Sequence, residues 1–309
     1  MLEANKREIH AFLPEITVDS IAPPYPNYPC FEGRELYPFR PEASTFDMVN
    51  AWWLIEATIL AWREPDFVTE RFRDAGLSEV SFFSGKSTQC YVADNDDFLI
   101  LVFRGTEIRP RPGRIDFGNI IMDVMADANF LLVDSGQGGK VHKGFKDAVD
   151  EVWEKAGLLD YLRSKDNGSR TFWFTGHSLG APLAALAAQR FGNVRGLYTF
   201  GSPRVGDLDF KTGFKVKTYR FVNNNDLVTR VPPAGIYQHV GDVKHIDGQG
   251  RIQEHPDTAE GVINGIGFEI SSSLNALERR LAGIDALIPE AIVDHVPIFY
   301  AAYIWNNIP

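Results

Sequence analysis

One stretch constrains the fold of this chain more than any other: TFWFTGHSLGAPLAALAAQRF, residues 171–191. An apolar run of strand composition ends at Gly176, and an alanine-rich run of helical composition begins at Leu179. Ser178 lies between two glycines in the pattern G-x-S-x-G. There a serine occupies a sharp strand-to-helix turn, because side chains at the glycine positions would collide with neighbouring backbone. The stretch predicts either a serine held out for chemistry or, more simply, a turn that contains serine.

The rest of the chain alternates strand and helix patterns, which predicts an α/β fold with a mostly parallel central sheet flanked by helices. Residues 1–45, rich in proline and tyrosine from residue 18 on, are expected to form an irregular lead-in. The absence of a repeat or linker favours one domain over residues 1–309. Predicted elements are a buried helix at 46–62, strands in EVSFF, QCYVAD and DFLILVFRG, an amphipathic helix at 144–162, a strand at 171–175, a helix at 179–191, strands at 196–200, 216–222 and 237–246, and helices at about 271–283 and 295–306.

Composition and charge argue against some kinds of binding partner and indicate an expected cellular location. The formal net charge of −10 and a pI near 5.2 argue against nucleic acid or an anionic bilayer held by a basic patch. Cys30 and Cys90 have no metal or redox spacing, and we expect both to be free, buried thiols. No apolar run has the length of a signal peptide core or a membrane span, so the expected location is cytoplasmic, or secreted if a signal segment has been removed.

A catalytic serine needs a base and an orienting carboxylate, which on this type of sheet follow it in the order serine, acid, histidine. Asp226 lies just past the strand-like run that ends at Val222, and acids at the carboxyl ends of parallel strands face the site. It is the first candidate for the acid, with a turn-capping role as the alternative. Weaker candidates are Asp207, Asp209 and Asp242.

The same order leaves four histidines as candidates for the base: His239, His245, His255 and His295. His295 lies at a loop-to-helix boundary just before Pro297, which suits a first helical turn. His255 is the second candidate, and spacing alone does not separate the two. His177 neighbours the serine and is expected to point away from it.

Taken together, these motifs resemble the class 3 lipases, the fungal-lipase-like branch of the α/β-hydrolases. The resemblance covers about residues 45–306 and implies Ser178 as nucleophile, Asp226 as acid and His295 as base, with no metal or organic cofactor. It runs in order through LVFRGT (101–106), VHKGF (141–145), FTGHSLGAPLAALAA (174–188), YTFGSPRVGD (198–207), FVNNNDLVTRVPP (221–233), YQHVGD (237–242) and DHVPIFY (294–300).

The resemblance also implies an oxyanion hole and a lid. The hole maps to the backbone amides of Thr106 and Leu179, while His142 matches a histidine with a structural role. The lid maps to about residues 107–122, which are longer and richer in Pro and Arg than a compact lid helix, so an inert surface loop is the alternative. Its apolar face would comprise Ile115, Phe117, Ile120, Ile121 and Met122.

The resulting expectation is a serine hydrolase of acylglycerols or related lipid esters, in transient contact with a lipid–water interface. Three alternatives within the same chemistry stay open: a phospholipase, a galactolipase or a feruloyl-type esterase. An α/β-hydrolase that binds a ligand without catalysis is the alternative from another class, although such proteins usually lack a member of the triad.

Overall fold

A computed structural model describes residues 13–15, 20, 23–105, 131–253 and 293–309 of the chain. Within these ranges eight strands form one sheet in the order β1-β2-β3-β6-β7-β8-β9-β10. The run from β3 to β9 is parallel, and β1, β2 and β10 pair antiparallel at its two sides. The strands are β1 (Glu79–Ser84), β2 (Gln89–Asp94), β3 (Phe98–Phe103), β6 (Thr171–His177), β7 (Gly196–Phe200), β8 (Thr218–Asn223), β9 (Asp242–Ile246) and β10 (Ile252–Gln253), with a separate hairpin of β4 (Leu132–Asp134) and β5 (Lys140–His142).

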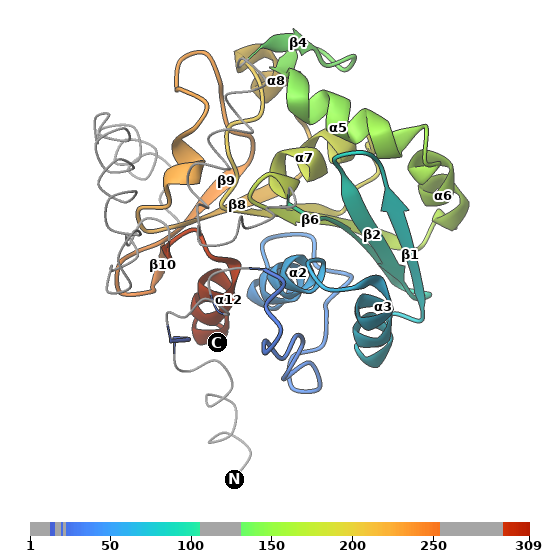
Figure 1. Cartoon of the computed structure of the whole chain (residues 1–309), viewed down its shortest axis with the longest axis vertical. Coiled ribbons are helices and arrows are strands. Elements are labelled where there is room, and N and C mark those ends of the chain that lie inside the picture. Colours follow the sequence, from blue (N-terminus) through green and yellow to red (C-terminus); the bar gives the residue numbers. More distant parts are fainter. Residues whose placement is uncertain (1–12, 16–19, 21–22, 106–130, 254–292) are drawn as a thin grey trace, which may run out of the picture.

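Helices cover both faces of this sheet (Figure 1). One face carries α2 (Met48–Leu60), α3 (Pro65–Asp74) and α12 (Pro297–Asn306). The other carries α5 (Lys143–Trp153), α6 (Leu158–Lys165) and α7 (Gly180–Phe191), and the short α8 (Leu208–Gly213) lies beside β5. The predicted mostly parallel sheet between helices, the α/β-hydrolase fold, is confirmed.

Strand β3 shows why the sheet is buried on both sides. Ile100 and Val102 belong to the core under α2, whereas Leu99 and Leu101 belong to the core under α5 and α7. Successive side chains of a strand point to opposite faces, so an almost continuous apolar run fits only a strand covered on both sides. The run DFLILVFRG predicted this correctly.

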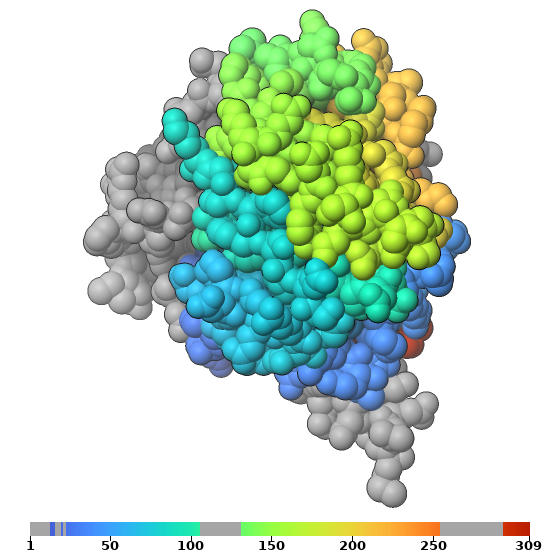
Figure 2. All heavy atoms as spheres, turned by 90° about the vertical axis from the view of Figure 1, so that its right-hand side faces the viewer, coloured from blue at the N-terminus to red at the C-terminus, as the bar shows by residue number. Residues whose placement is uncertain are grey.

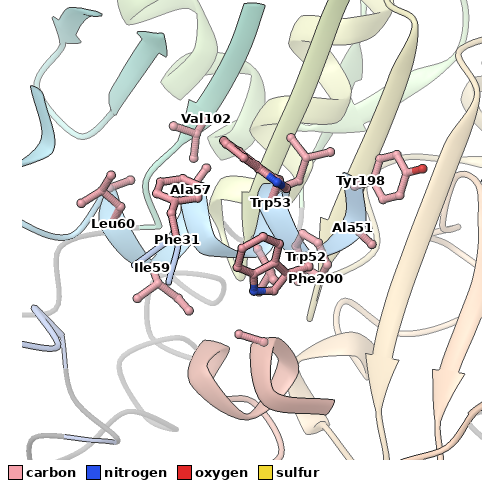
Figure 3. Packing of buried hydrophobic residues seen from close by; sticks show 14 of the residues in the cluster. Phe31, Ala51, Trp52, Trp53, Ala57, Ile59, Leu60, Val102, Tyr198 and Phe200 are labelled. Atoms are coloured by element: carbon pink, nitrogen blue, oxygen red, sulfur yellow. The ribbon is translucent and has the colours of Figure 1, made fainter. Parts of the chain in front are cut away.

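Helix α2 lies at the centre of the first core, and all its residues except Met48 are buried. Its cap is Asp47, whose carboxylate accepts a hydrogen bond from the amide of Asn50 at 3.0 Å. Figure 3 shows side chains from several segments gathered around the helix, among them Phe31 of the lead-in and Val102 of β3. A helix that is apolar on every side is stable only when surrounded in this way.

Helix α2 also carries a buried carboxyl group, Glu56, which ties the lead-in to the core. The carboxyl accepts hydrogen bonds from the Tyr28 hydroxyl at 2.6 Å, the Phe31 amide at 2.8 Å and the Trp52 indole at 3.1 Å. Burial nevertheless raises the pKa of Glu56 to about 7, since the three hydrogen bonds only partly offset the loss of water. The described residues 23–45 of the lead-in form turns and bends and are fixed to α2.

Three expectations about elements were wrong in detail. The helix expected at 144–162 is two helices, α5 and α6, because Gly157 adopts a left-handed conformation with φ of 79°. The strand expected at 237–246 is only β9, since Gly241, with φ of 87°, precedes it. Helix α3 was not predicted, although Pro65 at its first turn is a typical start signal.

The β1 side of the sheet is closed by neighbouring helices. Figure 2 shows this side, where atoms of α3, β1–β2 and α5–α6 form one continuous surface. Buried Asp94 at the end of β2 lies 3.2 Å from Lys165 Nζ of α6 and 3.3 Å from an Arg170 guanidinium nitrogen. These ion pairs fix α6 to the sheet.

The remaining expectations concern thiols, membranes, metals and domains. Cys90 is buried, Cys30 is only half-buried, and both thiols are free.

Across the described ranges, no helix has the length and apolar character to cross a membrane. In the same ranges, no group of three His, Cys, Asp or Glu residues could hold a metal ion. The helix expected at 271–283 lies outside the described residues, and the single domain over 1–309 stays a prediction.

The raised pKa of Glu56 predicts a pH-dependent stability. Its folded value of about 7 lies above the ordinary value of 4.5, so folding favours the protonated carboxyl. This contribution is complete below about pH 4.5 and is lost as the pH rises through about 7. Glu56→Gln removes the titration. Its free energy of unfolding relative to wild type, measured by urea denaturation, should rise by about 2 kcal/mol between pH 5 and pH 8.

The control is Glu70→Gln, which changes an exposed carboxyl on α3. Its free energy of unfolding should differ from that of wild type by the same amount at both pH values. If the free energy of unfolding of Glu56→Gln also differs from that of wild type by a constant amount, the raised pKa of the buried carboxyl is contradicted.

Candidate active site

Ser178 occupies the turn between the end of β6 and the start of α7. Its φ of 55° lies in the left-handed region that residues other than glycine rarely adopt. The Ser178 amide donates a hydrogen bond to the carbonyl oxygen of Phe200, the last residue of β7, at 3.0 Å. The turn is therefore strained and is fixed to the neighbouring strand.

The two glycines of G-x-S-x-G are required by close backbone contacts. A Cβ atom at Gly176 would lie 2.3 Å from the carbonyl oxygen of Gly180, and one at Gly180 would lie 2.3 Å from that of Phe103. Both distances are far shorter than a van der Waals contact. The steric reason expected from the pattern is present in the structure.

The structure brings Asp226 and His295 together although 69 residues separate them. His295 Nδ1 lies 3.0 Å from Asp226 Oδ1 and 2.9 Å from Oδ2, and both residues are buried. Asp226 follows β8 and begins the 3-10 turn Leu227–Arg230, while His295 lies two residues before α12. The pair thus joins the carboxyl end of a central strand to the C-terminal helix.

Two further donors fix the Asp226 carboxylate. The Val228 amide donates to Oδ1 at 2.9 Å, and the Tyr300 hydroxyl donates to Oδ2 at 2.6 Å. Burial raises the pKa of Tyr300 well above its ordinary value, and the nearby carboxylate acts in the same direction, so the hydroxyl keeps its proton. Sequence reasoning missed Tyr300; its only signal was its place in the first turns of the helix that follows His295.

The contact with Asp226 also orients the ring of His295. A ring nitrogen beside two carboxylate oxygens donates its hydrogen to them, and in a neutral ring Nε2 then has the lone pair. Within the described part of the chain, His295 Nε2 is buried and has no hydrogen-bond partner. The geometry therefore presents a base oriented by a carboxylate, without a hydrogen bond to Ser178 in this structure.

Asp294 joins the loop that carries Asp226 to the loop that carries His295. Its carboxylate accepts hydrogen bonds from the Asn225 amide at 3.0 Å and the Asn224 side chain at 3.1 Å. Its backbone carbonyl accepts another from the Asn223 side chain at 3.0 Å. The three asparagines before Asp226, which sequence reasoning treated only as a polar turn, are thus bonded to the residue before His295.

His177 contacts His295, which the sequence did not predict. The centroids of the two rings lie 4.6 Å apart. His177 Nε2 also lies 2.7 Å from the His295 carbonyl oxygen. The expectation that His177 points away from Ser178 stays a prediction.

Leu179, expected in the oxyanion hole, caps the N-terminus of α7 and is buried. None of the described residues accepts a hydrogen bond from its amide. The positive end of the α7 dipole adds to the attraction for negative charge at this point. Thr106 lies outside the described residues, and so do the expected lid face of Ile115, Phe117, Ile120, Ile121 and Met122 and the second candidate base, His255.

The other candidates have structural contacts. Asp207 caps α8 by accepting a hydrogen bond from the Phe210 amide at 2.9 Å, and His239 Nε2 contacts the Thr229 carbonyl oxygen at 2.8 Å. His142 is buried at the start of α5, with its ring 4.4 Å from that of Phe145. None of these contacts reaches Asp226 or His295 side chains.

Gly201 offers a test of how closely the Asp226–His295 pair is enclosed. A Cβ atom at Gly201, whose φ is 57°, would lie 2.8 Å from Asp226 Oδ2 and 2.9 Å from His295 Nδ1. Gly201→Ala should separate the two side chains and lower kcat for a p-nitrophenyl ester on the order of 10- to 100-fold, as measured in a spectrophotometric assay.

The matched control is Gly213→Ala at the end of α8, where a Cβ atom meets nothing within 4 Å. This variant should keep wild-type activity. Equal activity of folded Gly201→Ala and Gly213→Ala would show that the close packing around the pair is not needed.

Comparison with known proteins shows which family part of this chain is similar to. Residues 100–236 match the profile of the family described as Lipase (class 3). The matched range includes Ser178 and Asp226 and ends before His295, so it is narrower than the resemblance in the motifs.

Two relatives and one solved structure support the match. The chain is 35% identical to a lipase of Rhizomucor miehei over 48% of its own length and 42% of the relative's. It is 34% identical to the secreted mono- and diacylglycerol lipase 1 of Fusarium solani, over 51% of its own length and 47% of the relative's. The chain thus spans less than half the length of these curated relatives.

A crystal structure of an MDLA mutant from Penicillium cyclopium shares the fold, with a TM-score of 0.55 over 73% of this chain and 92% of that one, at 20% identity. The likeness at this identity concerns the fold alone. The match of residues 100–236 and the two fungal relatives show that about half of this chain is similar to the class 3 lipase family.

Proposed function

We propose that this protein is a serine carboxylic ester hydrolase that acts on acylglycerols or related lipid esters. Two observations carry the proposal: the buried Asp226–His295 contact, which leaves His295 Nε2 without a partner in the described residues, and the strained turn at Ser178, whose neighbour His177 contacts His295. The names of the two fungal relatives, a lipase and a mono- and diacylglycerol lipase, support the substrate class.

In the proposed acylation step, His295 Nε2 removes the proton from Ser178 Oγ as Oγ attacks the ester carbonyl carbon. The ring becomes positively charged, and the Asp226 carboxylate stabilises that charge while it holds the Nδ1 hydrogen. The Tyr300 hydroxyl and the Val228 amide keep the carboxylate in one orientation. These bonds exist before substrate binds, so the step needs little rearrangement of the acid and base.

The attack places a negative charge on the former carbonyl oxygen. We propose that the Leu179 amide at the start of α7 donates a hydrogen bond to it, and that the Thr106 amide and hydroxyl provide others. The unpartnered Leu179 amide supports its part of this assignment. The Thr106 part rests on its position after Arg104 and Gly105 in the sequence.

Collapse of the intermediate then transfers the proton from His295 Nε2 to the leaving alcohol and leaves an acyl group on Ser178. Water enters, His295 removes its proton, and the acid is released as Ser178 regains its hydrogen. The serine proton leaves with the alcohol and a proton from water replaces it, so Ser178 and His295 regain their starting protonation and the cycle uses these side chains and water without a metal or organic cofactor.

Contact with the lipid substrate is a further part of the proposal. The apolar residues Ile115, Phe117, Ile120 and Ile121 would meet a lipid–water interface when a lid over the site opens. The proposal also includes a cellular location. The name of the Fusarium relative includes the word secreted, which favours export over the cytoplasmic location expected from sequence.

Ser178→Ala removes the proposed nucleophile and should lower hydrolysis of triolein and of p-nitrophenyl butyrate by at least about 1,000-fold, because no acyl-enzyme can form. The melting temperature should stay close to that of wild type, since the side chain makes no hydrogen bond in the described part of the chain. Titration of the released fatty acid measures the hydrolysis of triolein, and absorbance measures the hydrolysis of p-nitrophenyl butyrate.

Ser135→Ala is the control, since Ser135 is also buried but its hydroxyl binds the Gly138 carbonyl in the β4–β5 hairpin. It should retain full activity. Full activity of Ser178→Ala would refute the catalytic mechanism, whereas faster cleavage of phosphatidylcholine than of triolein by wild type would refute only the substrate class.

A further inference from the structure

We propose that His177 is a positioning residue that fixes the backbone and the ring of His295 relative to Ser178. The proposal rests on the function proposed above, because it assigns His177 a task only if His295 is the base. It gives the histidine of the G-H-S-L-G sequence a task that its place beside the nucleophile does not suggest.

Two contacts join His177 to His295 across 118 residues of sequence. His177 Nε2 lies 2.7 Å from the His295 carbonyl oxygen, which fixes the backbone of the loop before α12. The two rings lie 4.6 Å apart at an angle of 33°, which limits rotation of the His295 side chain on that side. Asp226 holds the same ring at Nδ1, so His295 is held at two edges and at its backbone.

The position of His177 in the chain makes these contacts relevant to catalysis. It is the last residue of β6 and is directly bonded to Ser178. Its strand partner in β7 is Phe200, whose carbonyl also accepts the hydrogen bond from the Ser178 amide. A single residue thus connects the nucleophile turn to the loop that carries the base, and the distance between these two loops governs proton transfer.

The protonation of His177 fits this task. Burial lowers the pKa of His177 well below its ordinary value, and the neighbouring His295 acts in the same direction. The ring is therefore neutral, with its hydrogen on Nε2 toward the carbonyl oxygen and an unpartnered Nδ1 within the described structure. A neutral ring does not repel the positive charge that His295 acquires during the reaction.

Tyr300 encloses His177 from another element. Its ring lies 6.0 Å from the His177 ring in an edge-to-face arrangement, and its hydroxyl donates to Asp226. His177 therefore contacts the base directly and packs against the residue that orients the acid.

The test compares two substitutions of similar shape. His177→Gln keeps a side-chain N–H that can reach the His295 carbonyl, whereas His177→Met has no donor. We expect kcat for p-nitrophenyl butyrate to fall about 100-fold in His177→Met and about tenfold in His177→Gln, with KM changed less than about twofold, because substrate binding is untouched. The rate of labelling by a fluorophosphonate should fall in the same order.

The control is His239→Gln. His239 is also buried, and its Nε2 contacts a backbone carbonyl, that of Thr229, at 2.8 Å. Loss of this contact should change kcat by less than about twofold. Melting temperatures of all variants separate a loss of folded protein from a loss of activity per folded molecule.

Three results would overturn the proposal: kcat of folded His177→Met within twofold of wild type, equal kcat of the Gln and Met variants, or a fall in kcat that the folded fraction explains.

If His177→Met does not fold, the test uses His177→Gln and the low-field NMR signal of the His295 Nδ1 hydrogen. The proposal expects this signal to broaden in His177→Gln. An unchanged signal with unchanged kcat would refute the proposal. Failure of the proposed function is distinguishable, since it appears as activity that survives in Ser178→Ala.

Discussion

The arrangement of this site depends on the contact between the Asp226 carboxylate and the His295 ring. Asp226 is 1% exposed, and a buried carboxylate without partners would cost several kcal/mol. The ring, the Tyr300 hydroxyl and the Val228 amide supply three donors, so the charge is tolerated in one orientation. The same bonds that make the charge tolerable also leave Nε2 of the ring as the free basic atom.

The parallel sheet explains how these groups meet. Strands β6, β7 and β8 are neighbours, and the turns at their carboxyl ends carry Ser178, Gly201 and Asp226 in that order. The absence of a side chain at Gly201 leaves room for the acid and the base. His295 arrives from a different part of the chain, and α12 packs on α2 to hold it there. Asp294 then bonds that segment to the turn before Asp226.

Sequence predicted the elements and the candidate residues better than the contacts between them. The apolar run of β3 and the G-x-S-x-G turn each follow from local sterics and periodicity, so both were predicted correctly. The contacts of Tyr300 with Asp226 and of His177 with His295 depend on segments that meet only after folding, so the sequence did not predict them. The division of the 144–162 helix was readable from Gly157 in retrospect, because a left-handed glycine interrupts a continuous helix, and here it precedes the first residue of α6.

The central claim is that the structure activates one serine. Incubation of the protein with a fluorophosphonate, followed by proteolysis and mass spectrometry, identifies any serine made nucleophilic by a neighbouring base. The account predicts one adduct per chain, on Ser178 in the peptide that contains GHSLG. An adduct on a different residue, or no adduct on folded protein, would contradict it.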